Sequence, residues 1–147
     1  MAAEFTWDMS KAGHMIDTSV AEATVRPPAI LVVEDEVLIR LPIVEHLLDC
    51  GYHVFGVSNA AEAITVLHRN KVHIDLVFTD VRMPGKMDGW GLAAWVREHH
   101  PEKGVIVTSA EQRHAAHELC LELPFLQKPY DFDDVAARID AVTRKAA

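Results

Sequence analysis

The sequence predicts an α/β domain in which five parallel strands form one sheet with helices on both faces. Short runs of apolar, often β-branched residues suit strands that are buried on both faces. These runs alternate strictly with segments whose apolar residues recur at helical spacing, which indicates right-handed crossover connections. The chain has 147 residues, 50% of them hydrophobic and 24% charged, which is enough for one domain with a buried core.

The first 28 residues differ from the rest of the chain. They mix small, polar and isolated apolar residues without a sustained period, and they lack the basic start and apolar centre of a secretion signal. The run Gly13-His14-Met15 is typical of a cloning scar. We therefore expect residues 1–28 to be disordered or derived from a tag. The pair Pro27-Pro28 should mark the start of a single domain over residues 29–147.

The first strand and the first helix follow directly. Residues 30–33 are an unbroken apolar run, as expected for a buried strand. The next apolar residues recur at helical spacing and predict a helix; they are Val37, Leu41, Val44 and Leu48. Gly51 should end this helix. Pro42 lies inside it and should kink the helix or reset its start.

The second strand is expected at residues 52–57 and the third at residues 74–79, where it ends at Asp80. Between them, Ser58 is placed to cap a helix. One face of that helix carries Ala60, Ile64 and Leu67. After Asp80, a third helix carries Leu92, Val96 and His99 on one face.

The remaining elements continue the alternation. Strands are expected at residues 105–108 and 125–127. A fourth helix between them is suggested by Ala115, Ala116, Leu119 and Leu123. Asp131 is a good cap for the last helix. The buried face of that helix carries Phe132, Val135, Ile139 and Val142.

Composition excludes several classes of protein. No apolar run approaches the length that spans a membrane. The formal net charge is −8 and no segment is rich in Lys and Arg, which disfavours direct binding of nucleic acid. Cys50 and Cys120 form no metal-binding or disulfide spacing, so they fit a reducing compartment, the cytoplasm.

Polar residues follow four of the predicted strands. They are Glu34-Asp35-Glu36, Asp80, Thr108-Ser109-Ala110 and Lys128-Pro129. In a doubly wound sheet, ligands bind at the carboxyl ends of the strands, near the point where the strand order reverses. One acidic residue after a strand is more often a helix cap than a ligand. Because four strand ends carry suitable groups together, we expect these side chains to converge on one pocket.

The chemistry of that pocket follows from its charges. Carboxylates that lie close together repel, and a divalent cation removes the repulsion. Oxygen ligands without His or Cys select Mg²⁺ (or Mn²⁺) rather than zinc. The ammonium of Lys128 and the hydroxyl of Ser109 are suitable donors to a phosphoryl group. A carboxylate beside them can act as the nucleophile and form an aspartyl phosphate.

The chain resembles the receiver domain of two-component response regulators, the CheY-like family, over residues 30–142. The motifs that carry the resemblance are residues 32–36, 78–84 with 87–89, 107–110 and 125–129. The resemblance implies a flavodoxin-like, doubly wound sheet of five parallel strands in the order 2-1-3-4-5 with five helices. It fits either a stand-alone receiver or one excised from a longer protein.

The resemblance also implies roles for the residues of the pocket. Asp80 would be the phosphoacceptor, and Lys128 would bridge it to the phosphoryl group. Asp35 would bind Mg²⁺ directly, and Glu34, where the family more often has Asp, would bind it through water. The backbone carbonyl of Arg82 would complete the protein ligands, together with Asp80.

Two further residues take the family's switch positions. Ser109 directly precedes Ala110 and is therefore the switch hydroxyl, whereas Thr108 falls one residue short. Phe125 takes the aromatic switch position but lacks the hydroxyl of a Tyr. The implied switch moves Ser109 toward the phosphoryl group and lets Phe125 turn inward, which reshapes a surface that a partner binds.

These roles imply a signalling receiver in a phosphorelay that catalyses no reaction beyond its own phosphorylation and slow dephosphorylation. Its expected partners are a histidine kinase or a phosphotransfer protein and a downstream target protein, with a homodimer left open. The alternative is a degenerate receiver that acts only as a protein-interaction module. A haloacid-dehalogenase-type phosphatase would need a second Asp where this chain has Arg82. A flavin-binding module would need a phosphate loop where it has Glu34-Asp35-Glu36.

Overall fold

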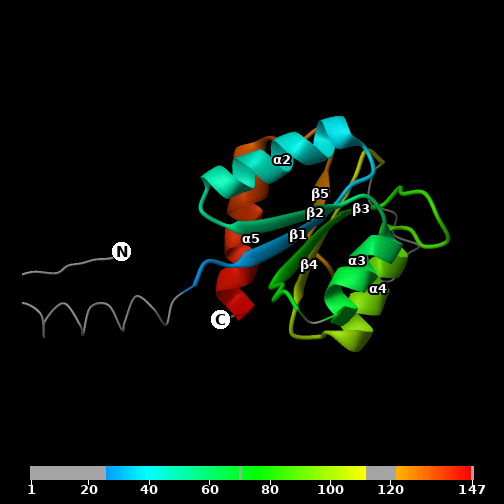
Figure 1. Ribbon diagram of the computed structural model, residues 1–147. Helices are drawn as coiled ribbons and strands as arrows, with labels where there is room; N and C mark the ends of the chain where they lie inside the picture. Colours follow the sequence, from blue (N-terminus) through cyan, green and yellow to red (C-terminus); the bar gives the residue numbers. More distant parts are fainter. Residues whose placement is uncertain (1–25, 70, 112–121, 147) are drawn as a thin grey trace, which may run out of the picture.

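The computed structural model describes residues 26–69, 71–111 and 122–146. Their strands form one parallel sheet in the order β2-β1-β3-β4-β5, which confirms the predicted fold class (Figure 1). The strands are β1 (Ala29–Val33), β2 (His53–Val57), β3 (Leu76–Asp80), β4 (Gly104–Ser109) and β5 (Phe125–Gln127). Within these ranges, no helix is long and apolar enough to cross a membrane.

Four helices lie in the described part of the chain. They are α2 (Val37–Asp49), α3 (Ala60–Arg69), α4 (Gly89–His99) and α5 (Phe132–Ala146). Helices α2 and α5 cover one face of the sheet, and α3 and α4 cover the other (Figure 1). The predicted helix near Ala115 and the second cysteine, Cys120, fall in residues 112–121, outside the described residues.

Alternation along the strands divides the core into two layers. One layer joins the sheet to α3 and α4 through residues that include Leu31, Val77 and Val107. Residues one position away along the same strands, such as Ile30 and Phe78, pack on α2 and α5. Because successive side chains of a strand point to opposite faces, each unbroken apolar run supplies both layers.

Local sequence signals explain how the helices begin and end. Helix α2 ends at Asp49, and Gly51 follows two residues later, with a φ of 98° that suits glycine and an N–H that donates to the carbonyl of Leu48. Asp131 caps α5, as predicted, since its Oδ1 accepts from the N–H of Asp133. The prediction for α3 was wrong by one residue: Asn59 is the cap, because its Oδ1 accepts from the N–H of Glu62.

Helix α2 corrects the sequence prediction most clearly. The predicted apolar stripe is largely exposed: Val37, Leu41 and Leu48 are 45%, 57% and 51% exposed. Instead, Ile43 and Leu47 pack against the sheet. Apolar residues lie on both sides of this helix, so periodicity alone does not identify the buried side. Pro42 does not reset the start of the helix, which runs through it from Val37.

Helix α4 needs a smaller correction. Leu92 and Val96 are buried as predicted, but His99 is exposed. Its ring stacks on Trp95 with a centroid distance of 4.4 Å, and its Nδ1 lies 2.9 Å from the carbonyl oxygen of Trp95. Ala93 takes the buried position instead, and His99 contributes nothing to the core.

The corrected face of α2 yields a stability prediction. Leu47 is fully buried against the sheet, whereas Leu38 on the same helix is 86% exposed. We expect Leu47→Ala to lower the free energy of unfolding by about 2 to 5 kcal/mol, because it leaves a cavity in the core. Leu38→Ala should change it by no more than about 0.5 kcal/mol. Urea unfolding of dilute protein measures both, and equal losses would contradict the assignment of the buried face.

Candidate functional site

The carboxyl edge of the sheet carries the predicted site. Strand β2 lies on one side of β1, and the next strand in the chain, β3, lies on the other side. The strand order therefore reverses beside β1. Glu34 and Asp35 follow β1 directly, and Asp80 is the last residue of β3. Lys128 follows β5. The topology therefore brings residues that are far apart in sequence to the edge where ligands bind in this class of fold.

Three carboxylates form a cluster that could hold a metal ion. Glu34, Asp35 and Asp80 each offer one oxygen, and these oxygens all lie within 4.8 Å of one another. Glu34 and Asp80 are buried, whereas Asp35 is exposed. All the donors are carboxylate oxygens, and the exposed side leaves space for water, as Mg²⁺ requires. Among the described residues, this is the one group of acidic, His or Cys side chains with such spacing.

Lys128 supplies the positive charge beside this cluster. Its Nζ lies 2.8 Å from Oε1 of Glu34 and 3.4 Å from Oδ1 of Asp80. Burial disfavours the charged ammonium, but the hydrogen bond to Glu34 and the charge of Asp80 outweigh burial and raise the pKa of Lys128. The ammonium therefore stays charged and contacts both buried carboxylates.

The two buried carboxyl groups respond in the same direction to their surroundings. Burial is the main cause that raises the pKa of Glu34, although its hydrogen bond with Lys128 acts in the opposite direction. Burial likewise raises the pKa of Asp80, against the charge of Lys128. One ammonium thus compensates only part of the cost of burying two negative charges. A second cation at the cluster would stabilise both ionised groups.

Close packing fixes the loop that follows Asp80. The N–H of Gly89 donates to the carbonyl of Val81 at 2.7 Å, and the N–H of Val81 donates to the carbonyl of Thr108. A Cβ on Gly89 would lie 2.1 Å from the carbonyl oxygen of Asp80, so no other residue fits there without displacement. Asp88 then caps α4 by accepting from the N–H of Gly91. This loop therefore returns to the end of β3 at a fixed point.

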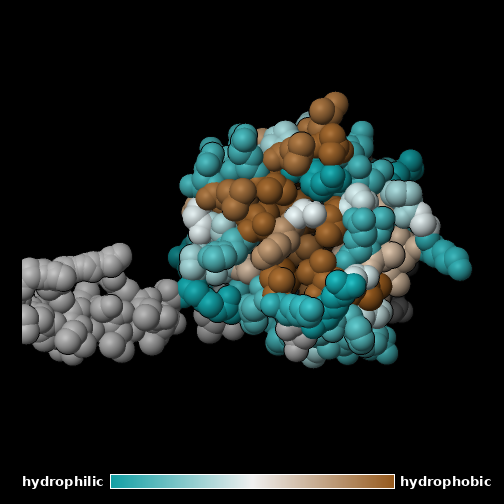
Figure 2. Space-filling view, viewed as in Figure 1, coloured by the Kyte–Doolittle hydropathy of each residue, from teal (hydrophilic) through white to brown (hydrophobic). Residues whose placement is uncertain are grey.

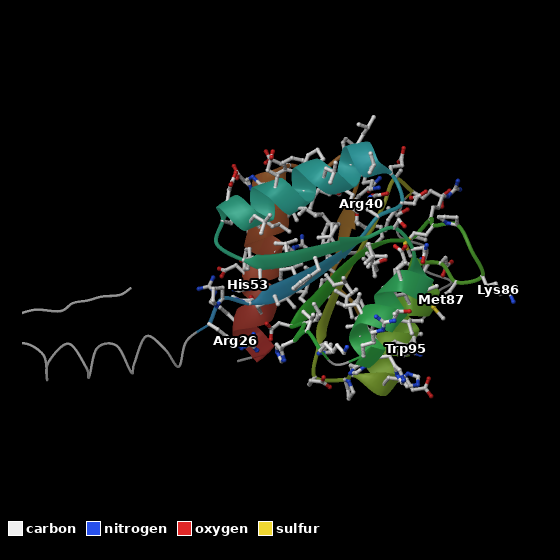
Figure 3. The ribbon with its side chains drawn as sticks, in the orientation of Figure 1. Arg26, Arg40, His53, Lys86, Met87 and Trp95 are labelled. Atoms are coloured by element: carbon white, nitrogen blue, oxygen red, sulfur yellow. The ribbon has the colours of Figure 1, made fainter. Side chains whose placement is uncertain are left out.

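Two residues of the site were missed by sequence reasoning. Arg40 extends from α2, and its Nη1 donates to the carbonyl of Glu34 at 2.7 Å (Figure 3). Tyr130 packs edge-on against Phe78. Burial, together with the charge of Glu34, raises the pKa of its hydroxyl, which has no hydrogen-bond partner among the described residues. The signal for Arg40 was its place in the first helix after the acidic strand end.

The predicted switch residues lie on the face covered by α3 and α4. Ser109 is buried, and its Oγ accepts from the N–H of Glu111. The ring of Phe125 stacks on Trp90 with a centroid distance of 6.2 Å and an interplanar angle of 6°. Thr108 is one position away along β4, so it points to the opposite face. Trp90 is thus a direct neighbour of Phe125, the predicted aromatic switch residue.

The side chain of Arg82 lies at the exposed rim of the site. It forms an ion pair with Glu111, which follows β4. Only the guanidinium takes part, so the ion pair does not involve the backbone carbonyl that was predicted to bind the metal. The ion pair links the loop after β3 with the loop after β4, on either side of the edge where Asp80 ends.

Comparison with known proteins identifies the family. Residues 30–140 match the family model of the response regulator receiver domain. The chain belongs to this family. A receiver protein from Sinorhizobium medicae has a similar structure, with a TM-score of 0.72 and 29% identity over 82% of this chain and 98% of that one. The response regulator TrrA from Thermotoga maritima, solved with Mg²⁺ and beryllofluoride, has a TM-score of 0.71. It is 26% identical over 78% of this chain and 98% of that one.

Sequence relatives of this receiver are longer proteins. The sensory transduction protein BceR of Halalkalibacterium halodurans is 32% identical over 119 residues, which are 79% of this chain and 50% of that protein. This receiver thus spans about half the length of the curated relatives it matches.

The raised pKa of Asp80 yields a prediction for metal-free protein. Because burial penalises the ionised carboxylate, Asp80→Asn should raise the melting temperature near neutral pH. A raised acid pKa means that the folded state binds the proton more tightly, so the wild type gains stability as pH falls through that pKa. The advantage of Asp80→Asn should therefore shrink in acid. Asp88→Asn, on an exposed side chain, is the matched control. If Asp80→Asn were no more stable than the wild type at neutral pH, burial would not be the main cause of the raised pKa of Asp80.

Proposed function

We propose that this receiver accepts a phosphoryl group on Asp80 from a histidine kinase or a phosphotransfer protein and then changes a surface that a target protein binds. The observation that carries the proposal is the approach of Lys128 to Asp80, at 3.4 Å, inside the cluster of three carboxylates. Membership of the receiver family and the solved complex of TrrA with Mg²⁺ and beryllofluoride support it.

The carboxylate oxygens of the cluster suit Mg²⁺ (or Mn²⁺). Asp35, Asp80 and the carbonyl of Arg82 would hold the ion, and Glu34 would act through water. When bound, the ion neutralises negative charge on the carboxylates and on the incoming phosphoryl group. A carboxylate oxygen of Asp80 forms the new bond to phosphorus, while the bond from phosphorus to the donor's histidine nitrogen breaks and the electron pair stays on the nitrogen. Lys128 contacts the acceptor and offsets the charge that gathers there.

The switch would use residues on the other face of the sheet. Phosphorylation replaces the single negative charge of the Asp80 carboxylate with a phosphoryl group that carries about two negative charges and three acceptor oxygens. The hydroxyl of Ser109, which now accepts from the N–H of Glu111, can turn to donate to one of these oxygens. Phe125 can then move, and its ring contact with Trp90 changes with it. Such a change is a shift between two packings of one core.

Intact-mass measurement tests phosphorylation. Incubation with acetyl phosphate and Mg²⁺ should add one phosphoryl group to the wild type and none to Asp80→Asn. Asp88→Asn makes the same chemical change in the next loop and should keep the label. Omission of Mg²⁺ should abolish labelling of the wild type, because the negative charge of the carboxylates around Asp80 then repels the phosphoryl donor. Folded wild type that gains no mass and does not bind beryllofluoride would refute the proposal and favour the degenerate interaction module.

Trp90 offers a test of the switch. In a variant that keeps Trp90 as its single tryptophan, Mg²⁺ and beryllofluoride should change the emission spectrum, because the ring stacks on Phe125. We expect Ser109→Ala to keep beryllofluoride binding and to lose most of the spectral change. Asp80→Asn should show neither. An undiminished change in Ser109→Ala would show that the hydroxyl does not couple the site to Phe125.

A further inference from the structure

One side of helix α2 carries an apolar stripe that the core covers only in part. It consists of Val37, Leu41, Val44 and Leu48, of which Val44 is half-buried against the core and the others are exposed. Ile43 and Leu47, on the other side of the helix, already pack on the sheet. Figure 2 shows apolar side chains gathered along α2 and continuing toward the strands below it. An apolar surface of this kind is typical of a protein–protein contact.

The spacing of the stripe indicates that its partner is a helix. Its residues are separated by four, three and four positions, the pattern that places side chains along the seam between two packed helices. The stripe is also complementary to itself. In an antiparallel pair centred between Pro42 and Ile43, Val37 lies opposite Leu48 of a second copy. Leu41 lies opposite Val44 of that copy. Each contact along the helix pair thus joins a smaller Val side chain to a larger Leu side chain.

The neighbouring strand presents a second unused surface. Strand β2 is at the edge of the sheet, paired only with β1 among the described residues. The N–H of His53 donates to the carbonyl of Pro28, and the carbonyl of Val57 accepts from the N–H of Glu34, so these residues face β1. By alternation, Val54 and Gly56 direct their N–H and C=O groups to the open edge. Free edges of this kind pair readily with another strand.

We propose that the α2 and β2 side of this receiver is an interface with a second copy of the same chain, related by a two-fold axis. Strand β2 pairs antiparallel with β2 of the second copy, and the two-fold axis passes beside Phe55. The backbone N–H and C=O groups of Val54 in one copy then form hydrogen bonds with those of Gly56 in the other. The two α2 helices then lie antiparallel on the same face of the continuous sheet. Such an interface is isologous, because both copies use the same surface.

The strand and helix contacts are geometrically compatible. Val44 lies over the edge strand, since its Cγ2 is 3.3 Å from the point that a Cβ on Gly56 would occupy. If α2 lies above the gap between β1 and β2, a strand spacing of about 4.8 Å places it about 5 Å from the two-fold axis. The two helices are then about 10 Å apart, the distance at which helices pack.

Access to the site also favours a second copy. Because the paired β2 strands run antiparallel, the carboxyl edges of the two sheets face opposite directions. Both clusters around Asp80 therefore stay open to a phosphoryl donor.

Sedimentation velocity over a wide range of protein concentration tests the interface. We expect the mass of the wild type to double as concentration rises, and Leu41→Glu to stay monomeric because it places a charge in the middle of the seam. Ala94→Glu adds the same charge on the exposed side of α4 and should dimerise as the wild type does. Circular dichroism checks that both variants fold.

Hydrogen exchange at β2 gives a second, independent measurement. The amides of Val54 and Gly56 should exchange more slowly as the wild type dimerises, and this protection should be lost in Leu41→Glu. A wild type that stays monomeric at every concentration would overturn the proposal. So would a dimer that survives Leu41→Glu or leaves both amides unprotected. A monomer whose α2 stripe binds only the helices of a histidine kinase would also overturn it and assign the face to that partner.

Discussion

The contact of one buried ammonium with two buried carboxylates depends on the register of the whole sheet. Glu34, Asp80 and Lys128 follow or end β1, β3 and β5, and β4 lies between the last two strands. Their distances of 2.8 and 3.4 Å exist only because three successive strand pairings are in register. The ammonium of Lys128 opposes the effect of burial, which raises the pKa of both carboxyl groups. The site is therefore a property of the assembled sheet.

In the proposed function, the phosphoryl chemistry uses one face of the sheet and the switch uses the other. On one face, Tyr130 packs against Phe78 beneath the charged cluster. On the other, Ser109 lies in the same layer as the stacked rings of Trp90 and Phe125. A strand residue reaches one face only, so adjacent residues of β4 can serve different purposes. This explains how Thr108 and Ser109, both hydroxyl residues, differ in what they can couple to.

Strand–helix alternation was sufficient to predict the fold, and the residues after the strands were sufficient to predict the cluster of Glu34, Asp35 and Asp80 with Lys128. The buried side of α2 was not predictable, because Leu47 and Leu48 are equally apolar neighbours and only packing distinguishes them. The contact of Arg40 with the carbonyl of Glu34 and the fit of Gly89 against Asp80 depend on tertiary distances. Local patterns carry no information about such distances. His99 had the right spacing for the core but lies beyond the reach of the sheet.

The loop after β3 is closed at its neck, since Val81 both donates to Thr108 and accepts from Gly89. Residues between these two points form an excursion that reaches outward through Gly85, at a φ of 103°, and Lys86 (Figure 3). Changes in length inside a closed loop cost little conformational entropy and leave its base in place. The tip near Lys86 is accordingly a natural insertion point for protein engineering. A reporter peptide or an affinity handle placed there would lie near Asp80 without altering the geometry of the end of β3.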